Sequence, residues 1–485
     1  MRKTESSTSR HTAVGLPVLG AAPSSSSGAG PAPVVSFVSL GCAKNLVDSE
    51  KMLGQIAESG AVISGDESAA DTIVVNTCGF LESSRAEALE VLHELAERKR
   101  RGTLRRIVVA GCLVQRDGEK IREWVPEVDA IVGVNNRDDV VRAVWRLDRD
   151  AAIDRYLGDY HAVGVGAANR WNDQGRLRLT PSHYAYVRIS EGCDQKCTFC
   201  TIPSIRGPMH SKTPDELVAE GRELITDGAK ELILIGQDTT SYGHDIGFGG
   251  GLAGLLRRLD AEWDGAKWVR LMYVYPSIMT DEMIDAIASS QRVVKYIDIP
   301  LQHINDRVLK SMHRRVTRRE TETLLAKLRE RIPGVTIRTT FIVGFPGETE
   351  AEFAELERYV SEFDFDAVGA FRYSLEPETP AGRMKTQLDE AVKTERYERL
   401  MLAQQDAVLA RARKWIGRSF EVLVDSDEDE RGPVCRHAGQ APEVDSVCIA
   451  ADAELPLGEF ATVKCVDTDD YDLVVKPAKR RLKVL

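Results

Sequence analysis

The chain has 485 residues, of which 43% are hydrophobic and 29% charged, and its formal net charge is −11. This composition is ordinary for a globular protein, and the length predicts about three domains. The negative charge argues against a protein that binds nucleic acid mainly by neutralising phosphates. The nine cysteines do not resemble the disulfide framework of a secreted protein, so we expect a protein of the reducing cytoplasm.

Residues 1–33 are rich in Ser, Ala, Gly and Pro and lack helical or strand periodicity, which predicts a disordered extension. The apolar stretch 13–22 loosely resembles a secretory signal, but Gly15, Pro17 and Gly20 interrupt it. No later stretch reaches the roughly 18 apolar residues that a membrane span requires. We therefore expect no membrane association.

Buried strands alternate with amphipathic helices over residues 34–147, which predicts a doubly wound α/β domain with a parallel sheet. The expected strands are 34–40, 72–76, 106–110 and 130–133. Cys42, Cys78 and Cys112 each follow one of the first three strands by two residues. Because the carboxyl ends of parallel strands share one edge of the sheet, the three thiols can converge there. They predict a cluster site with three thiolates, although chance placement of buried cysteines is the alternative.

Residues 148–182 contain several glycines and are expected to form a linker to the next domain. Residues 183–416 again alternate strands with helices, three of which open with capping boxes at Thr213, Thr317 and Thr349. Six strand and helix units predict a partial, open (β/α)6 barrel. The expected strands are 184–190, 231–235, 268–275, 296–299, 335–342 and 366–371.

Three further cysteines, Cys193, Cys197 and Cys200, directly follow the first strand of this barrel in the spacing Cys-x3-Cys-x2-Cys. Thiolates suit zinc or iron–sulfur centres. Structural zinc needs four protein ligands, and His183 and His210 each lie ten residues outside the triplet. A four-iron cluster on three thiolates leaves one iron open to a small molecule. The alternative is a structural metal knuckle with a fourth ligand elsewhere.

The triplet, with Phe199 before its last cysteine, resembles the signature of the radical S-adenosylmethionine (SAM) superfamily. The resemblance implies that SAM binds the open iron and is cleaved to methionine and a 5'-deoxyadenosyl radical. Residues 341–348 resemble the SAM-contacting segment of that superfamily, and residues 236–238 are expected at the same rim of the barrel, with an ordinary turn as the alternative for each. His303, after the fourth strand, is either a substrate contact or a polar loop residue. The candidate SAM contacts are Gly236, Gln237, Ile342, Gly344 and Pro346.

Residues 417–485 contain short strand-like runs with polar turns, which predict a small β-barrel. These runs are 420–424, 446–449, 461–466 and 473–475. The segment holds 15 acidic and nine basic residues, so it suits a basic partner better than a nucleic-acid backbone. Cys435, Cys448 and Cys465 lack ligand-like spacing and are expected in the core.

Cys42, Cys78 and Cys112 upstream of the triplet, with a small barrel behind it, resemble the methylthiotransferase family from residue 34 onward. Segments 38–50, 76–80, 236–243 and 296–303 resemble its ribosomal-protein branch more than its tRNA branch. Two departures exist. Ala43 stands where that branch usually has proline, and residues 207–210 are less basic than in the family.

The resemblance implies two [4Fe-4S] clusters, SAM, and an OB-like TRAM domain over 417–485 that recruits substrate. It implies that an aspartate of the twelfth small-subunit ribosomal protein, free or in the subunit, receives a methylthio group on its β-carbon. One SAM would supply the methyl group and another the radical, with no catalytic side chain beyond the cluster ligands. A flavodoxin or ferredoxin would donate electrons to a monomeric enzyme.

Two other functions remain as alternatives. The first is a tRNA methylthiotransferase that acts on a modified adenosine, and the second is a non-enzymatic iron–sulfur regulator that binds RNA. The first would carry out the same chemistry on RNA, whereas the regulator would need a basic surface and no SAM pocket. The acidity of the chain and of its last domain argues against both.

Overall fold

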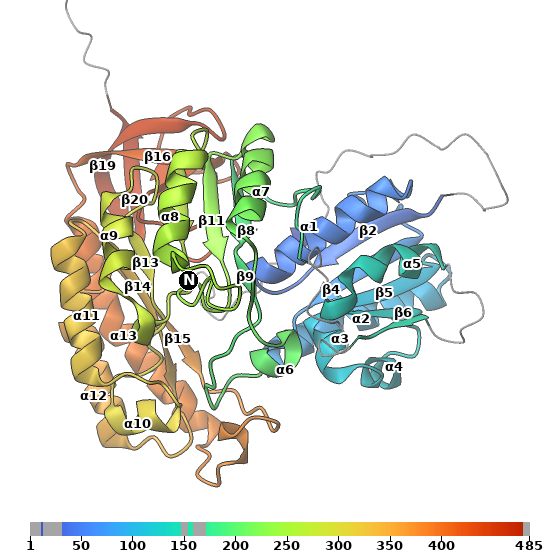
Figure 1. The fold of residues 1–485 in the computed structure, drawn as a ribbon, viewed down its shortest axis with the longest axis horizontal. Helices are drawn as coiled ribbons and strands as arrows, with labels where there is room; N and C mark the ends of the chain where they lie inside the picture. Colours follow the sequence, from blue (N-terminus) through green and yellow to red (C-terminus); the bar gives the residue numbers. More distant parts are fainter. Residues whose placement is uncertain (1–10, 13–31, 147–153, 159–170, 479–485) are drawn as a thin grey trace, which may run out of the picture. The chain divides into compact units, whose positions relative to one another are not determined.

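The computed structural model describes residues 11–12, 32–146, 154–158 and 171–478 (Figure 1). They form two compact units. The first comprises the chain up to residue 180 together with 191–195 and 200–210, and the second comprises 181–190, 196–199 and 211 onward. Among the described helices, none combines the length and apolarity that a membrane crossing would need.

The first unit is built on a mainly parallel sheet in the order β2-β4-β5-β6-β7. The short strand β3 pairs with β2 in parallel, and β1 pairs with it in the antiparallel direction. The rest of the expected extension before residue 32 lies outside the described residues. The strands are β1 (His11–Thr12), β2 (Val34–Ser39), β3 (Val62–Ile63), β4 (Thr72–Thr77), β5 (Arg106–Gly111), β6 (Ala130–Gly133) and β7 (Asp154–Tyr156).

Helices cover both faces of this sheet. One core joins Met52 and Ile56 of α1 (Ala43–Glu58) and Val144 of α5 (Val140–Trp145) to the strands. A second core on the opposite face joins the strands to α2 (Glu82–Arg100), α3 (Cys112–Asp117) and α4 (Lys120–Trp124). Alternate residues of each strand serve the two cores, which explains the continuous apolar runs of the sequence. The predicted doubly wound domain is therefore confirmed.

The described part of the expected linker differs from a simple connection. β7 extends the parallel sheet beside β6. Farther along, the backbone N–H of Leu177 donates to the carbonyl of Glu50 at 3.1 Å, and Asp173 is 1% exposed. These contacts bind residues 171–180 to α1. Glycine content alone suggested a linker, whereas the segment gains its order from tertiary contacts with the first unit.

The second unit contains six parallel strands in two groups, β8-β11-β12 and β13-β14-β15. The groups are connected where the Val274 N–H donates to the Asp298 carbonyl at 2.9 Å. In Figure 1 the helices α8, α9, α11 and α12 form the outer layer. The open (β/α)6 barrel is therefore confirmed. Its strands are β8 (Tyr184–Arg188), β11 (Glu231–Ile235), β12 (Trp268–Leu271), β13 (Tyr296–Asp298), β14 (Thr336–Val343) and β15 (Ala367–Arg372).

One barrel strand is shorter than expected. The apolar run predicted a strand to residue 275, but β12 ends at Leu271, and Tyr273 has a φ of 61°. A left-handed residue cannot continue a strand, so the chain turns there.

Three helices of this unit begin at the capping boxes that the sequence predicts. The side chains of Thr213, Thr317 and Thr349 each accept from the third helical N–H, and all three capping boxes are complete. The helices are α7 (Pro214–Thr226), α8 (Gly251–Glu262), α9 (Asp281–Ser289), α10 (Asp306–Ser311), α11 (Arg318–Arg331), α12 (Glu350–Glu362) and α13 (Glu390–Arg413).

The C-terminal segment of the second unit is a closed barrel in the order β16-β17-β18-β20-β19. Cys435, Cys448 and Cys465 are fully buried in its core, as expected. The sequence runs missed β17, a four-residue strand between an acidic turn and a polar loop. The basic tail from residue 479 lies outside the described residues. The strands are β16 (Ser419–Ser426), β17 (Val434–His437), β18 (Cys448–Ala450), β19 (Phe460–Asp469) and β20 (Asp472–Pro477).

A buried ionic network fixes this small barrel to the amino ends of the larger barrel's strands. Arg436 of β17 pairs with Glu231 of β11 at 2.8 Å and with Asp425 of β16. Glu231 also accepts from Arg270 at 2.7 Å, and His183 lies 2.9 Å from Asp425. Arg436, Glu231 and Arg270 are at most 1% exposed. The two barrels of this unit therefore pack as one body.

We expect Arg436→Met to lower the free energy of unfolding by about 3–5 kcal/mol, because it removes a buried cation that pairs with both Glu231 and Asp425. Arg431→Met is the matched control: Arg431 pairs with Asp429, but its side chain is 43% exposed. The control should change stability by less than about 0.5 kcal/mol. Urea denaturation measures both variants, and equal losses would contradict the structural role of Arg436.

Candidate functional site

Cys42, Cys78 and Cys112 all lie at the carboxyl edge of the first unit's sheet. Cys42 is the N-cap of α1, Cys78 directly follows β4, and Cys112 begins α3 directly after β5. The strand ends are shifted by one residue from the expected ones. Gly41 has a φ of 100°, and a Cβ on it would lie 2.7 Å from the Cys78 Cβ. Glycine is required there because the turns before two of the thiols approach each other closely.

The environments of these thiols differ. Cys42 is exposed, whereas Cys78 and Cys112 are 8% and 5% exposed. Burial raises the pKa of Cys78 to about 11 and that of Cys112 to about 12, while the positive charge of Arg206 acts in the opposite direction on both. Thiols with such pKa values stay protonated at neutral pH, so binding of a metal centre must displace their protons.

The donor chemistry fits an iron–sulfur cluster. Three thiols from three adjacent strand ends are soft ligands, and the nearby Arg206 can offset the charge that they acquire as thiolates. In the part of the chain that the structure describes, no group of three His, Cys, Asp or Glu side chains is close enough to hold a single metal ion. All nine cysteines are described, and none forms a disulfide.

Cys193, Cys197 and Cys200 lie in the loop that leads into α6 (Ile202–Arg206). In the first unit, the Cys193 N–H donates to the Gly207 carbonyl at 3.1 Å, and the Ile202 N–H donates to Cys200 Sγ at 3.5 Å. Backbone N–H groups therefore help to fix the conformation of this loop.

Cys197, which belongs to the second unit, has a cationic and aromatic environment. Arg314 Nη1 donates to Cys197 Sγ at 3.8 Å, and the Tyr275 hydroxyl lies 4.0 Å from the same sulfur. The guanidinium of Arg314 also stacks 4.0 Å from the centroid of the Tyr275 ring. A fixed cation beside a cysteine can offset the negative charge that the sulfur carries as a metal ligand. Sequence reasoning missed Arg314 and Tyr275, because no local pattern indicates that they approach Cys197.

The candidate SAM contacts all lie at the carboxyl end of the second unit's barrel. Gly236 and Gln237 follow β11, Ile342 belongs to β14, and Gly344 and Pro346 follow β14. A Cβ on Gly236 would lie 2.8 Å from Ser190 Oγ, a buried hydroxyl without a hydrogen-bond partner among the described groups.

Gly344 has a packing role in addition to any contact with a ligand. Its φ is 74°, and a Cβ there would lie 2.5 Å from Lys393 Cγ of α13. The Glu348 carboxylate accepts from its N–H at 3.1 Å. His303 is 1% exposed, lies 3.6 Å from Glu348, and accepts from the Asn305 N–H at 3.0 Å. These contacts favour a structural role for His303 over contact with substrate.

Three domain families match consecutive parts of the chain. Residues 34–133 match the uncharacterized protein family UPF0004, residues 187–360 the radical SAM superfamily, and residues 416–477 the TRAM domain. Among solved structures, the radical SAM methyltransferase TsrM from Kitasatospora setae is similar with a TM-score of 0.51 and 15% identity. The match covers 69% of this chain and 72% of that one. This likeness supports the fold.

Sequence relatives match over most of the chain. The ribosomal protein uS12 methylthiotransferase RimO of Trichlorobacter lovleyi is 42% identical over 91% of this chain and 97% of its own length. The protein of the same name from Anaeromyxobacter sp. (strain K) is 45% identical over 91% and 92%. With the radical SAM match and the fold, these relatives decide the family. The chain belongs to the methylthiotransferase family of radical SAM enzymes, in its RimO branch.

Proposed function

We propose that this enzyme attaches a methylthio group to the β-carbon of an aspartate residue in ribosomal protein uS12. The relatives named as uS12 methylthiotransferases support this assignment most directly. The two sets of three thiols suit the chemistry, which inserts sulfur at an unactivated C–H bond. When bound, two [4Fe-4S] clusters and SAM supply the radical and the methylthio group.

In this proposal each part of the chain has one task. Residues 34–147 hold the auxiliary cluster through Cys42, Cys78 and Cys112. Residues 183–416 hold the radical SAM cluster and SAM, and residues 417–485 bind the substrate protein. Cys193, Cys197 and Cys200 bind the second cluster. The candidate SAM contacts are Gly236, Gln237, Ile342, Gly344 and Pro346. We further propose that the enzyme is a cytoplasmic monomer, reduced by a flavodoxin or ferredoxin.

The chain's own residues prepare these sites. Arg314 and Tyr275 supply a cation and a hydroxyl beside Cys197. The packing of Gly344 against Lys393 fixes the backbone after β14, where an adenosyl group would approach main-chain atoms. In this proposal Arg314 and Tyr275 position Cys197, and Gly344 positions the backbone that would contact SAM. None of these residues needs to transfer a proton.

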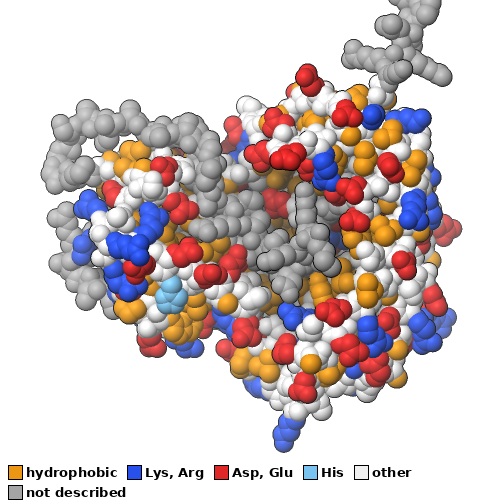
Figure 2. All heavy atoms as spheres, turned by 180° about the vertical axis from the view of Figure 1, so that it is seen from behind, with side chains coloured by type: hydrophobic (Ala, Val, Ile, Leu, Met, Phe, Trp, Pro, Cys, Tyr) orange, Lys and Arg blue, Asp and Glu red, His pale blue; other side chains and the backbone are white. Residues whose placement is uncertain are grey.

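The surface charge of the small barrel agrees with a basic protein partner. Asp427, Glu428 and Glu430 are exposed, whereas Asp429 pairs with Arg431 at 2.9 Å. On the face drawn in Figure 2, the described side chains mix acidic and basic groups rather than forming a broad basic surface. The exposed carboxylates of the small barrel attract a basic ribosomal protein more readily than a nucleic-acid backbone.

Replacing Asp427, Glu428 and Glu430 by Asn or Gln should slow association with uS12 severalfold and reduce its salt dependence. Exposed charges steer encounter over about 8 Å at physiological ionic strength. Stopped-flow fluorescence or surface plasmon resonance measures the association rate. The full chain is used because the small barrel shares a buried ionic network with the larger barrel. The control replaces Glu82, Glu90 and Glu94, which are exposed on α2, by Gln. If both variants associated with uS12 equally slowly, the acidic residues of the small barrel would have no specific role in steering uS12.

Mass spectrometry of uS12 and of tRNA from a strain that lacks the gene tests the proposed function. We expect the methylthio group to disappear from the uS12 aspartate, to return when the wild-type gene is restored, and to stay unchanged on tRNA adenosines. Loss of the modification from tRNA, with uS12 unaffected, would favour the tRNA enzyme instead.

A further inference from the structure

Near the strand-end thiols of Cys42, Cys78 and Cys112 lies a buried polar side chain, Asn45, in the first turn of α1. Asn45 is 1% exposed. Its Nδ2 donates to the Leu40 carbonyl at 3.0 Å and to the Thr77 carbonyl at 2.9 Å. Leu40 precedes Cys42 by two residues, and Thr77 directly precedes Cys78. One amide group therefore connects the two strand ends that carry these cysteines.

The same amide group also reaches the third cysteine. Cys112 Sγ donates to Asn45 Oδ1 at 3.3 Å. The orientation of the amide is determined by its neighbours, because both Nδ2 hydrogens point at carbonyl oxygens, which can only accept. Rotation of the amide by 180° would place an oxygen against those carbonyls. Asn45 thus contacts all three elements that carry the thiols.

Arg206, at the end of α6, is the second donor to the Asn45 side-chain oxygen. It is 3% exposed, and its Nη2 donates to Asn45 Oδ1 at 2.5 Å. Its Nη1 donates to Glu191 at 2.8 Å, and Nη2 also lies 3.2 Å from Asp48. All of these residues belong to the first unit. Arg206 follows Cys200 by six residues, so one short segment carries a proposed ligand of one cluster and a cation beside the other.

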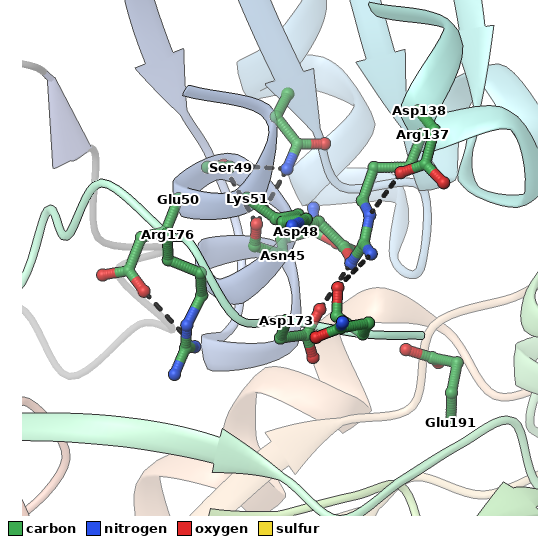
Figure 3. A network of polar contacts seen from close by, with 12 residues as sticks. Asn45, Asp48, Ser49, Glu50, Lys51, Arg137, Asp138, Asp173, Arg176 and Glu191 are labelled. Atoms are coloured by element: carbon green, nitrogen blue, oxygen red, sulfur yellow. Dashed lines mark hydrogen bonds and ion pairs between the residues drawn. The ribbon is translucent and has the colours of Figure 1, made fainter. Parts of the chain in front are cut away.

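A second buried arginine provides a comparison within the same network. Arg137 is 5% exposed and pairs with the other oxygen of Asp48 at 3.2 Å and with Asp173 at 2.7 Å. Figure 3 shows Arg137 between Asp48 and Asp173, beside α1. Arg137 shares the Asp48 partner of Arg206, but its own partners include neither Asn45 nor a cysteine in the contacts described.

We propose that Asn45 and Arg206 are positioning residues of the three-thiol site: Asn45 sets the spacing of the cysteines, and Arg206 supplies the positive charge that balances their thiolates. This inference rests on the proposed function, because it assumes that Cys42, Cys78 and Cys112 bind the auxiliary cluster. A buried cation close to a cluster stabilises its more negative, reduced form, and charge and hydrogen bonds near the sulfurs are established determinants of cluster potentials. Removal of that charge therefore makes reduction harder.

The test measures the reduction potential of the auxiliary cluster alone. The full-length chain with Cys193, Cys197 and Cys200 replaced by Ala serves as background, and reconstitution should give about four irons. Adding Arg206→Gln should shift the potential to more negative values by at least about 59 mV, a tenfold change in a one-electron equilibrium. Arg206→Lys keeps a positive charge and should recover most of the shift. The potential is followed by a redox titration with electron paramagnetic resonance detection.

Arg137→Gln in the same background separates this role from a structural one. It removes a buried arginine from the same aspartate, so we expect a loss of thermal stability similar to that of Arg206→Gln. Its cluster potential should stay within the error of the background. Equal potentials in the Arg137→Gln and Arg206→Gln chains, or no recovery with Arg206→Lys, would overturn the role of Arg206. A background chain that binds no iron would instead contradict the proposed function.

The spacing role of Asn45 has its own readout. Asn45→Leu keeps a side chain of similar branched shape but removes the amide, so the Leu40 and Thr77 carbonyls and Arg206 lose a partner. We expect iron content after reconstitution to fall by at least half in the same background, while Arg137→Gln retains it. Full iron loading with an unchanged cluster spectrum in the Asn45→Leu chain would overturn the positioning role.

Discussion

A chain in which Cys193, Cys197 and Cys200 are all replaced by alanine should lose reductive cleavage of SAM completely and retain about four irons. The three thiols lie in one loop beside α6, and removal of all three leaves a cluster at that loop without ligands. The auxiliary thiols, on separate strand ends of the first unit's sheet, are not altered. Iron analysis after anaerobic reconstitution and measurement of 5'-deoxyadenosine check both statements.

The control variant replaces Cys435, Cys448 and Cys465, which are buried in the small barrel, by alanine. It removes the same number of thiols and should keep the iron content of the wild type and the cleavage of SAM. Formation of 5'-deoxyadenosine by the Cys193/Cys197/Cys200 variant would show that the radical cluster has been assigned to the wrong cysteines.

The second large effect concerns Cys42, Cys78 and Cys112. Their joint replacement by alanine should preserve reductive SAM cleavage but abolish the methylthio product, because Cys193, Cys197 and Cys200, the proposed ligands of the radical-generating cluster, remain. Methylthio product falls below detection while 5'-deoxyadenosine stays within about twofold of the wild type. Liquid chromatography with mass detection measures both products in one reaction. Methylthiolated product at the wild-type level would rule out an essential auxiliary cluster at these residues.

Buried strands and capped helices were the most predictable part of the fold. Apolar runs gave β4, β5 and β11 within one residue, and Thr213 and Thr349 mark helix starts through local hydrogen bonds. Both signals are local in sequence, which explains their success. β17 was missed because only the first two of its four residues are apolar, and Arg436 within it is buried through ion pairs with Glu231 and Asp425 that the local sequence does not reveal.

The two sets of cysteines were visible in the sequence because of spacing and strand ends, but their surroundings were not. Asn45 and Arg206 read as ordinary polar positions on helices, yet each is nearly inaccessible and contacts a residue more than 60 positions away. Arg314 reaches Cys197 across 117 positions. Such contacts depend on tertiary folding, so no local pattern of one sequence reveals them.

The most direct measurement of the central claim is a reaction of purified enzyme, reconstituted with iron and sulfide, with both uS12 and tRNA. SAM labelled with deuterium in its methyl group identifies the transferred group. We predict a labelled methylthio group on one uS12 aspartate, absent when Cys42, Cys78 and Cys112 are replaced by alanine, and no labelled methylthio adenosine. Label on tRNA adenosine and none on uS12 would contradict the account.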